Sequence, residues 1–317
     1  SMRGEAVALK PQGRPGLLCR MRNCWQLYLF LVIPVALTLI FRYYPMLGIQ
    51  IAFKNFDYRL GIWGSPWVGL RHFGRFVKSY QFSRVLFNTL RLSLYGLIAG
   101  FPLPILFALL LNALPFKRYK KLVQTVTYMP HFISVVVMVG IISQLLNIHV
   151  GIYGQAYKAF TGTTAPDVLG IASAFPHVYV WSGVWQGLGF NSIIYVAALA
   201  GVDAELHEAA EIDGASLFQR VLHIDFPTIL PTASIMLILA CGNVLSVGFE
   251  KVYLMQNTLN QRTSEVISTY VYKVGMVTGG GDFSFGTAVG LFNSIVNFAL
   301  LMLVNFCTKK LGGNSLW

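Results

Sequence analysis

The chain has 317 residues, of which 55% are hydrophobic and 11% are charged, and its formal net charge is +12. Soluble globular domains carry about 25% charged residues, so this composition and a mean hydropathy of +0.61 argue against a soluble protein and indicate one that crosses a membrane several times. A nucleic-acid partner is not expected, because the basic residues lie in loops where membrane topology and lipid head groups account for them.

Six apolar stretches are long enough to cross a bilayer, which requires about 20 mostly apolar residues in a helix. They cover, approximately, residues 25–44, 86–114, 123–147, 174–200, 227–249 and 286–307. We therefore expect an all-α membrane protein with six transmembrane helices in a single domain, 25–310. The flanking segments 1–24 and 311–317 are expected to be tails, and an even number of spans places both tails on the same side.

Basic residues close to the spans predict which side is cytoplasmic. The short loop after the second span, PFKRYKKL, carries four cations, and further basic residues occupy the N-terminal tail and the pair Lys309-Lys310. These three segments share one face of a six-span bundle, and the positive-inside rule makes that face cytoplasmic. The first external loop is also basic, but long loops carry little weight under this rule. Both termini are therefore predicted to be cytoplasmic, and the N-terminal tail has no signal-peptide cleavage pattern.

The first external loop contains the amphipathic stretch GLRHFGRFVKSY. Helical spacing places Leu70, Phe73, Phe76, Val77 and Tyr80 on one face, opposite three cations. This pattern predicts a helix that lies on the outer membrane surface. A loop helix packed on the bundle fits the pattern equally well.

Six of the twelve acidic residues are concentrated between Asp203 and Asp225, in the loop that joins the fourth and fifth spans. Asp203 is a good N-cap for a first helix, and Gly214 is suited to a left-handed stop. Ser216 and Gln219 form the pattern of a capping box that opens a second helix. The loop, 202–226, is thus predicted to contain two short helices bent at Gly214. Such an acidic projection suits docking to a basic surface, although a solvated loop is also compatible with the pattern.

The same loop carries a long motif, EAA-x3-G-x9-I-x2-P, and through it the chain resembles the membrane subunits of ATP-binding-cassette importers. The one departure is Phe226, where that family usually has Leu. The resemblance implies the type I importer permease fold in the bacterial inner membrane, with a coupling helix between helices 4 and 5 that sits in a cleft of a separate ATPase. The implied coupling residues, with Glu208 and Gly214 foremost, are Glu208, Ala209, Ala210, Asp213, Gly214, Ile224 and Pro227.

A narrower resemblance extends over about residues 25–310. The stretch 43–73, the triplet 88–90 and the external TGGGDFSFGTA, 278–288, are similar to oligosaccharide and polysaccharide permeases of the lipoprotein-B-like group, alginate permeases above all. This resemblance implies a second permease subunit of different sequence, a dimer of ATPase subunits and a periplasmic binding protein as partners. The implied substrate is an oligosaccharide or polysaccharide, including acidic chains such as alginate.

Motifs for catalysis by this chain are not found in the sequence. There is no Gly-x-x-x-x-Gly-Lys-Ser/Thr motif, so ATP and Mg²⁺ are expected on the partner ATPase and no cofactor is expected here. His-Glu-x-x-His and Gly-x-Ser-x-Gly motifs are missing too, and the four cysteines lack metal-binding spacing. We therefore expect a subunit that is not an enzyme, with no catalytic residues and no metal site.

Polar and aromatic residues inside the spans are candidates for contact with a sugar, since polar groups in a bilayer normally face a partner or a cavity. Aromatic rings can also mark the membrane interface, and asparagines can bridge helices. Arg91 is the only cation well inside an expected span and suits an acidic sugar. The candidates are Arg91, Trp181, Trp185, Gln186, Asn191, Tyr195, Asn243, Asn293 and Asn297.

Two other functions remain compatible with a hydrophobic bundle. A self-sufficient channel or secondary transporter for a small polar solute would carry flux without nucleotide, but the spans contain few acidic residues for a proton or sodium relay. A membrane enzyme is disfavoured because nucleophile and metal constellations are missing. Co-purification with an ATPase distinguishes the importer subunit from both.

Overall fold

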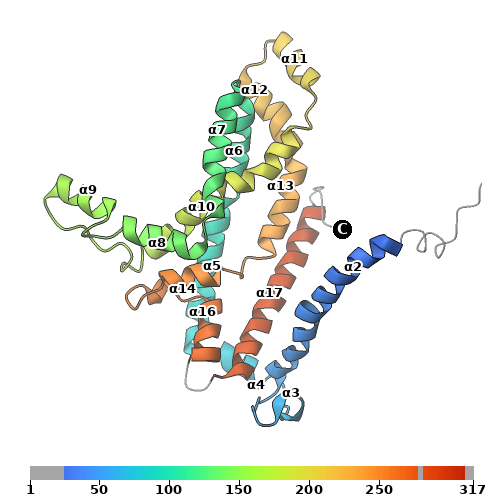
Figure 1. Ribbon diagram of the computed structural model, residues 1–317, viewed down its shortest axis with the longest axis vertical. Coiled ribbons are helices and arrows are strands. Elements are labelled where there is room, and N and C mark those ends of the chain that lie inside the picture. The colour runs from blue at the N-terminus through green and yellow to red at the C-terminus, as the bar shows by residue number, and fades with distance from the viewer. Residues whose placement is uncertain (1–24, 278–280, 311–317) are drawn as a thin grey trace, which may run out of the picture. The chain divides into compact units, whose positions relative to one another are not determined.

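The computed structural model describes residues 25–277 and 281–310, and these residues form helices joined by loops (Figure 1). The β-structure among them is one isolated antiparallel bridge between Lys54 and Trp67. The all-α prediction is therefore confirmed for the described chain. The chain divides into two compact units, one that ends at Gln50 and one that begins at Ile51, and each is described separately.

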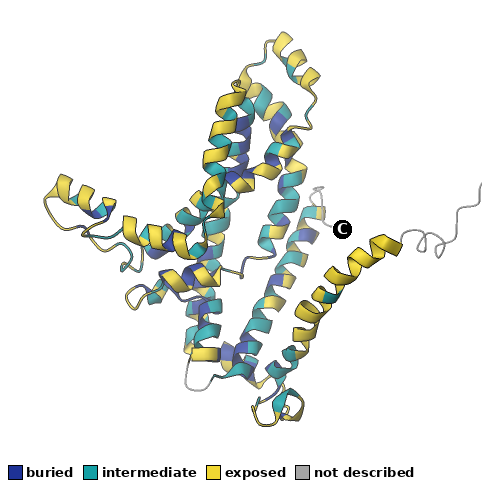
Figure 2. Ribbon diagram, viewed as in Figure 1, coloured by how far each residue is buried: buried dark blue, intermediate teal, exposed yellow. Residues whose placement is uncertain are grey.

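The first unit is one apolar helix in which α-helical, π-helical and 3₁₀-helical segments follow one another. It comprises α2 (Trp25–Thr38), the π-helical η1 (Leu39–Tyr43) and the 3₁₀-helical η2 (Tyr44–Phe53), whose last residues belong to the second unit. None of the residues of α2 is buried (Figure 2). A helix that is apolar on every side is stable only when an apolar medium surrounds it, so α2 has the properties of a lipid-embedded helix.

The second unit is a helical bundle with short helices at both ends. Its elements before the acidic loop are α3 (Gly61–Gly64), α4 (Arg71–Val77), α5 (Tyr80–Gly100), α6 (Pro102–Ala113), α7 (Lys117–Tyr128), η3 (Met129–Phe132), α8 (Val135–Leu145), α9 (Ile152–Thr161) and α10 (Phe175–Leu199). The remaining elements are α11 (Ala204–Ile212), α12 (Leu217–Arg220), the π-helical η4 (Val221–Asp225), α13 (Phe226–Cys241), α14 (Phe249–Met255), α15 (Gln261–Ser264), α16 (Ile267–Tyr272), the π-helical η5 (Lys273–Val277) and α17 (Phe283–Lys310).

Helix α10 lies at the centre of this bundle. It packs mainly on α5 and α6, and also on α7 and α13, while α13 packs in turn on α17. The absence of a side chain at Gly189 permits the approach of α10 to α7, because a Cβ there would lie 2.3 Å from the Thr127 carbonyl oxygen. Figure 1 shows α11 and α12 at one end of the bundle and α4 with α16 at the other.

Candidate membrane spans number four among the described residues, or six if two bent helix pairs each count as one span. The four are Trp25–Phe53, Tyr80–Ala113, Leu217–Cys241 and Phe283–Lys310. The bent pairs are Lys117–Phe132 with Val135–Leu145, at 102°, and Phe175–Leu199 with Ala204–Ile212, at 76°. The expected six spans are within this range and stay a prediction.

The third expected span, 123–147, is interrupted in the structure. Pro130 lies in the 3₁₀ turn η3, and the Ser134 side chain caps the new helix α8 by accepting a hydrogen bond from the Val137 backbone amide at 3.3 Å. Proline cannot donate a helical hydrogen bond, and serine is a preferred N-cap. These two local signals explain why the apolar run forms two helices where one was expected.

The amphipathic helix expected in the first external loop is present as α4, and it packs on the bundle. Phe76 is buried in a cluster with residues of α5, α16 and α17, including Val85, Ile267 and Phe285. The Arg75 guanidinium forms an ion pair with Asp282 at 2.7 Å. Of the two alternatives that the pattern allowed, these contacts favour the loop helix packed on its own bundle.

Candidate functional site

A cavity of about 540 Å³ lies inside the second unit, between α5, α6, α10, α13 and α14. Small residues of α5 and α10, among them Gly96, Gly100 and Gly183, line part of its wall. Polar, aromatic and apolar side chains together line the rest. A concave site with a few polar groups on a largely apolar wall is the usual form of a binding site for a small molecule.

Four of the predicted substrate-contact residues line this cavity, namely Gln186, Asn191, Tyr195 and Asn243. The first three come from α10, which lies at the centre of the bundle and has one face toward the cavity. Gln186 is held in place because its amide donates a hydrogen bond to the Ile133 carbonyl oxygen at 2.9 Å.

Asn297 supports the cavity wall from behind. Its side-chain oxygen accepts a hydrogen bond from the Leu245 amide at 2.8 Å, and its amide nitrogen donates to the Ser246 hydroxyl at 2.8 Å. The side chain therefore fixes the loop between α13 and α14, and Ser246 in that loop lines the cavity. Asn293 instead lines a separate hollow of about 470 Å³ next to α16 and η5.

The remaining candidates lie outside the lining of the central cavity. Trp181 and Trp185 are each half exposed, and the Trp181 indole donates a hydrogen bond to the Tyr95 hydroxyl at 2.9 Å. Arg91 is exposed on α5.

Lys251 is a cavity residue that sequence reasoning missed. Its side chain is buried, and its ammonium donates a hydrogen bond to the Tyr179 carbonyl oxygen at 2.7 Å. The nitrogen lies 4.6 Å from the centroid of the Tyr179 ring. The sequence signal that could have identified Lys251 is a cation within the apolar stretch FEKVYLM. This stretch follows the fifth expected span, however, and its sequence is compatible with a loop. The structure folds it into α14, which forms part of the cavity wall.

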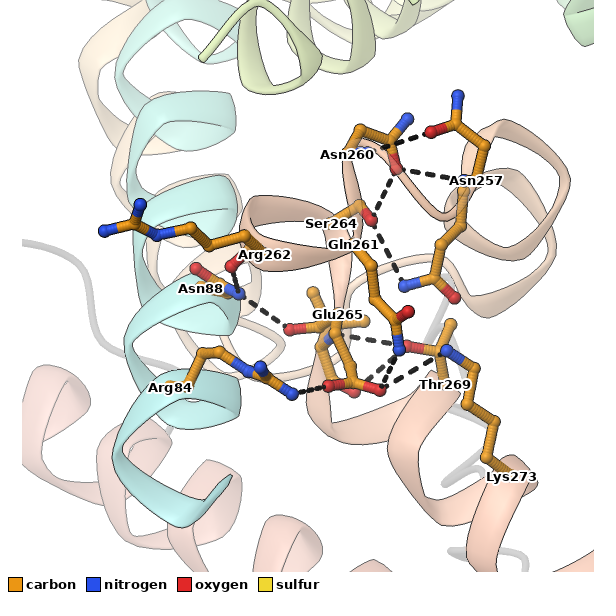
Figure 3. A network of polar contacts seen from close by, with 12 residues as sticks. Arg84, Asn88, Asn257, Asn260, Gln261, Arg262, Ser264, Glu265, Thr269 and Lys273 are labelled. Carbon is orange, nitrogen blue, oxygen red and sulfur yellow. Dashed lines mark hydrogen bonds and ion pairs between the residues drawn. The ribbon is translucent and has the colours of Figure 1, made fainter. Parts of the chain in front are cut away.

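A polar network around Glu265 holds the segment that follows α14 against α5 (Figure 3). The Glu265 carboxylate pairs with Arg84 of α5 and with Lys273, the latter at 3.3 Å. The Asn88 amide donates to the carbonyl oxygens of Arg262 and Glu265, each at 3.0 Å. Because Glu265 is 3% exposed, its two cationic partners compensate a carboxylate that has lost most of its water.

Replacement of Glu265 with alanine is expected to lower the stability of the protein by about 2 kcal/mol. Removing one partner of a buried ion pair leaves the other uncompensated, and partial exposure of both cations reduces the cost. The melting temperature of the purified protein in detergent measures this effect. Glu250→Ala, a change at an exposed glutamate of α14, serves as the control. An equal change in melting temperature in both variants would contradict a stabilising role for the Glu265 ion pairs.

The acidic loop forms two short helices joined by a sharp turn, as its capping signals predicted. The Asp203 carboxylate accepts a hydrogen bond from the Glu205 amide at the start of α11. Gly214 has a left-handed φ of 80°, and Ser216 with Gln219 forms a capping box at the start of α12. An ion pair between Arg220 and Glu211, at 2.8 Å, joins the two helices.

The motif residues of this loop differ in exposure. Glu208, Ala209, Asp213, Gly214 and Pro227 are exposed, whereas Ala210 and Ile224 are partly buried and line a hollow of about 300 Å³ at the bend. Large apolar side chains are exposed beside them, including Ile212 at 86% and Phe218 at 75%. Exposed apolar groups within an acidic projection are typical of a surface that docks a partner.

A second residue that sequence reasoning missed is Asp225, which is 2% exposed. Its carboxylate oxygen Oδ1 lies 3.1 Å from Nε2 of His207 and accepts a hydrogen bond from the Asn112 amide at 3.3 Å. His207 belongs to α11 and Asn112 to α6. Asp225 therefore links the helix at the tip of the loop directly to the bundle.

A metal-binding cluster is not seen among the residues that the structure describes, where no three His, Cys, Asp or Glu side chains converge. The polar groups that do converge are neutral amides and hydroxyls with one lysine in the cavity, and a carboxylate link at the acidic loop. Such groups can bind and position a polar ligand, and they can transmit motion.

A family model for the inner-membrane component of binding-protein-dependent transport systems matches residues 84–311. The chain therefore belongs to this family, within which it is a permease of the sugar ABC importer type. Subunits of this family are non-catalytic, multi-pass proteins of the inner membrane. The resemblance found in the sequence is confirmed.

Two relatives from Bacillus subtilis (strain 168) are similar over almost their whole length. Protein LplB is 40% identical over 308 residues, which are 97% of this chain and 96% of the relative. The polygalacturonan/rhamnogalacturonan transport system permease protein YteP is 39% identical over 313 residues, which are 99% of this chain and 97% of the relative.

Two crystal structures of alginate importers contain a chain with a similar fold. One, of a bacterial ABC transporter involved in the import of the acidic polysaccharide alginate, matches with a TM-score of 0.83 and 35% identity, and covers 93% of this chain and 98% of that one. The other, in complex with an alginate pentasaccharide-bound periplasmic protein, matches with a TM-score of 0.84 and 34% identity over 95% and 99% of the two chains.

Proposed function

We propose that this chain forms half of the translocation pathway of an ABC importer for oligosaccharides or polysaccharides, acidic ones in particular. The other half would be a second permease of different sequence. The observation that carries the proposal is a polar and aromatic cavity within a bundle of the sugar-permease family. Relatives named for polygalacturonan and alginate transport favour an acidic substrate.

In this proposal the single domain, 25–310, crosses the inner membrane six times, with both termini in the cytoplasm. The loop 202–226 is the coupling loop, and it docks in a cleft of an ATPase dimer that binds ATP and Mg²⁺. The opposite end of the bundle, which carries α4, faces the periplasm and receives sugar from a binding protein. The exposed acidic and apolar side chains of the loop 202–226 suit it to docking in the ATPase cleft.

The proposed mechanism uses the loop as the contact that transmits force. Closure of the ATPase dimer on ATP moves α11 and α12. The link from His207 through Asp225 to Asn112 carries that motion into the bundle. The spans then alternate between inward-open and outward-open arrangements, and the cavity is exposed to each side in turn. Glu208 and Gly214 are the proposed main contacts with the ATPase.

Reconstitution of the permease pair, the ATPase and the binding protein in liposomes tests the proposal. We expect ATP-dependent uptake of oligosaccharide and sugar-stimulated ATP hydrolysis. The same measurement with different sugars identifies the substrate. Uptake by this chain alone without nucleotide would contradict the proposal and favour a secondary transporter or channel.

A further inference from the structure

The central cavity contains one charged side chain among the described residues that line it, the ammonium of Lys251. We propose that Lys251 binds the carboxylate groups of an acidic sugar chain inside the cavity and gives the permease its preference for uronate over neutral sugars. This inference rests on the proposed function and goes further, since it assigns selectivity to a residue of the permease itself.

Lys251 is held rigidly at the wall. The next residue, Val252, and Met255 are buried in an apolar cluster with Leu92 and Val266. This packing fixes α14 against the bundle. The ammonium also occupies space that a glycine leaves open, since a Cβ at Gly183 would lie 3.1 Å from the Lys251 nitrogen. The position of the charge is therefore set by the fold.

The charge of Lys251 is not neutralised within the described chain. Among the residues that the structure describes, no carboxylate lies within 4.0 Å of its nitrogen, whereas the buried Glu265 has two cationic partners. The hydrogen bond to the Tyr179 carbonyl uses one of the three ammonium donors. A buried cation without an anion is costly, so an anionic group that enters the cavity gains a strong electrostatic partner.

The neighbouring groups match the rest of a sugar acid. Amides of Gln186, Asn191 and Asn243 line the same cavity and can bond hydroxyl groups, and Tyr179 and Tyr195 offer aromatic surface. A carboxylate with several hydroxyls on a compact ring presents complementary features. A neutral sugar satisfies the amides but leaves the ammonium without an anion. The geometry therefore selects uronic acids.

A purely structural role for Lys251 is the competing explanation, because its hydrogen bond to Tyr179 also joins α14 to α10. Lys251→Met removes the charge and keeps much of the apolar stem. Lys251→Arg keeps the charge. Lys158→Met, at an exposed lysine of α9, removes the same charge elsewhere. Melting temperatures of the three purified complexes report any structural damage.

The test measures equilibrium binding of a radiolabelled uronate oligosaccharide and of its carboxyl-reduced form to the purified permease–ATPase complex, without the binding protein. We expect the wild type and Lys158→Met to bind the acidic form about tenfold more tightly, the size of one charge-assisted hydrogen bond. Lys251→Met should lose this preference and Lys251→Arg should retain most of it. High salt should reduce the preference.

Equal binding of both forms by the wild type, or a preference that survives in Lys251→Met, would overturn the inference. Absence of binding of either form would overturn it too. Failure of the proposed function is recognised separately, as loss of ATP-dependent uptake by the wild-type complex with its binding protein. A wild type that imports only neutral sugar would leave the importer function standing and remove the role of Lys251.

Discussion

Replacement of Gly214 with valine is expected to reduce sugar-stimulated ATP hydrolysis of the assembled importer by about tenfold. The left-handed φ of 80° at this position costs an L-residue about 1–2 kcal/mol, and β-branching adds to the cost. A Cβ would meet no atom within 4 Å, so the strain lies in the backbone. The turn would open and α11 would shift relative to α12. ATP hydrolysis with and without substrate-loaded binding protein measures the effect.

Two matched variants separate strain at the coupling loop from general destabilisation. Gly214→Asn should keep most of the stimulation, because asparagine tolerates the left-handed region. Gly162→Val places the same residue at the end of α9, where φ is 72°, and should strain that turn without uncoupling. If all three variants behaved alike, the bend at Gly214 would have no special role in transmission.

Replacement of Asp225 with alanine is the second change expected to have a large effect, again about a tenfold loss of sugar-stimulated ATP hydrolysis. The buried carboxylate is the shared partner of His207 and Asn112, and its loss leaves both without that contact. Removing one member of a buried network costs about 1–3 kcal/mol per unsatisfied group. A movement of helix α11 would then no longer be transmitted to the bundle. Co-purification of the ATPase should persist, so the defect lies in coupling and not in assembly.

Asp225→Asn provides the conservative control. Its amide oxygen can still accept hydrogen bonds, so part of the stimulation should return. Glu211→Gln breaks the more exposed ion pair with Arg220, and such pairs contribute at most about 1 kcal/mol. This variant should remain close to the wild type. Full activity in Asp225→Ala would exclude the link through Asp225 as a route for motion.

The acidic loop was predictable because its determinants are local. Caps at Asp203 and Ser216 and a left-handed glycine at 214 act over three or four residues, and each has a strong residue preference. Its anchor was not predictable. Asp225 contacts Asn112, which lies 113 positions earlier in the chain, and no local pattern reports a contact of that range.

The cavity was predictable only in part, for a similar reason. Helical spacing grouped residues of α10 into pairs, but it could not show which face of the helix turns inward, so Trp181 and Asn191 were equal candidates. The packing of α10 against its neighbouring helices decides which of the two residues faces the cavity, and of the two only Asn191 lines it. Lys251 was missed because α14 joins the wall through tertiary packing of Val252 and Met255. Arg91 had the expected charge inside an expected span, yet it is exposed on α5.

The unbroken helix from Leu217 to Cys241 has a mechanical consequence. It begins at the capping box of α12, continues through the π turn η4 and ends at the cavity, where Met236 and Ala240 form part of the wall. At about 1.5 Å per residue its 25 residues form a lever about 37 Å long. A tilt of about 5° displaces one end by about 3 Å relative to the other. In the proposed importer, a small rotation at the ATPase would therefore alter the width of the cavity without any change in secondary structure.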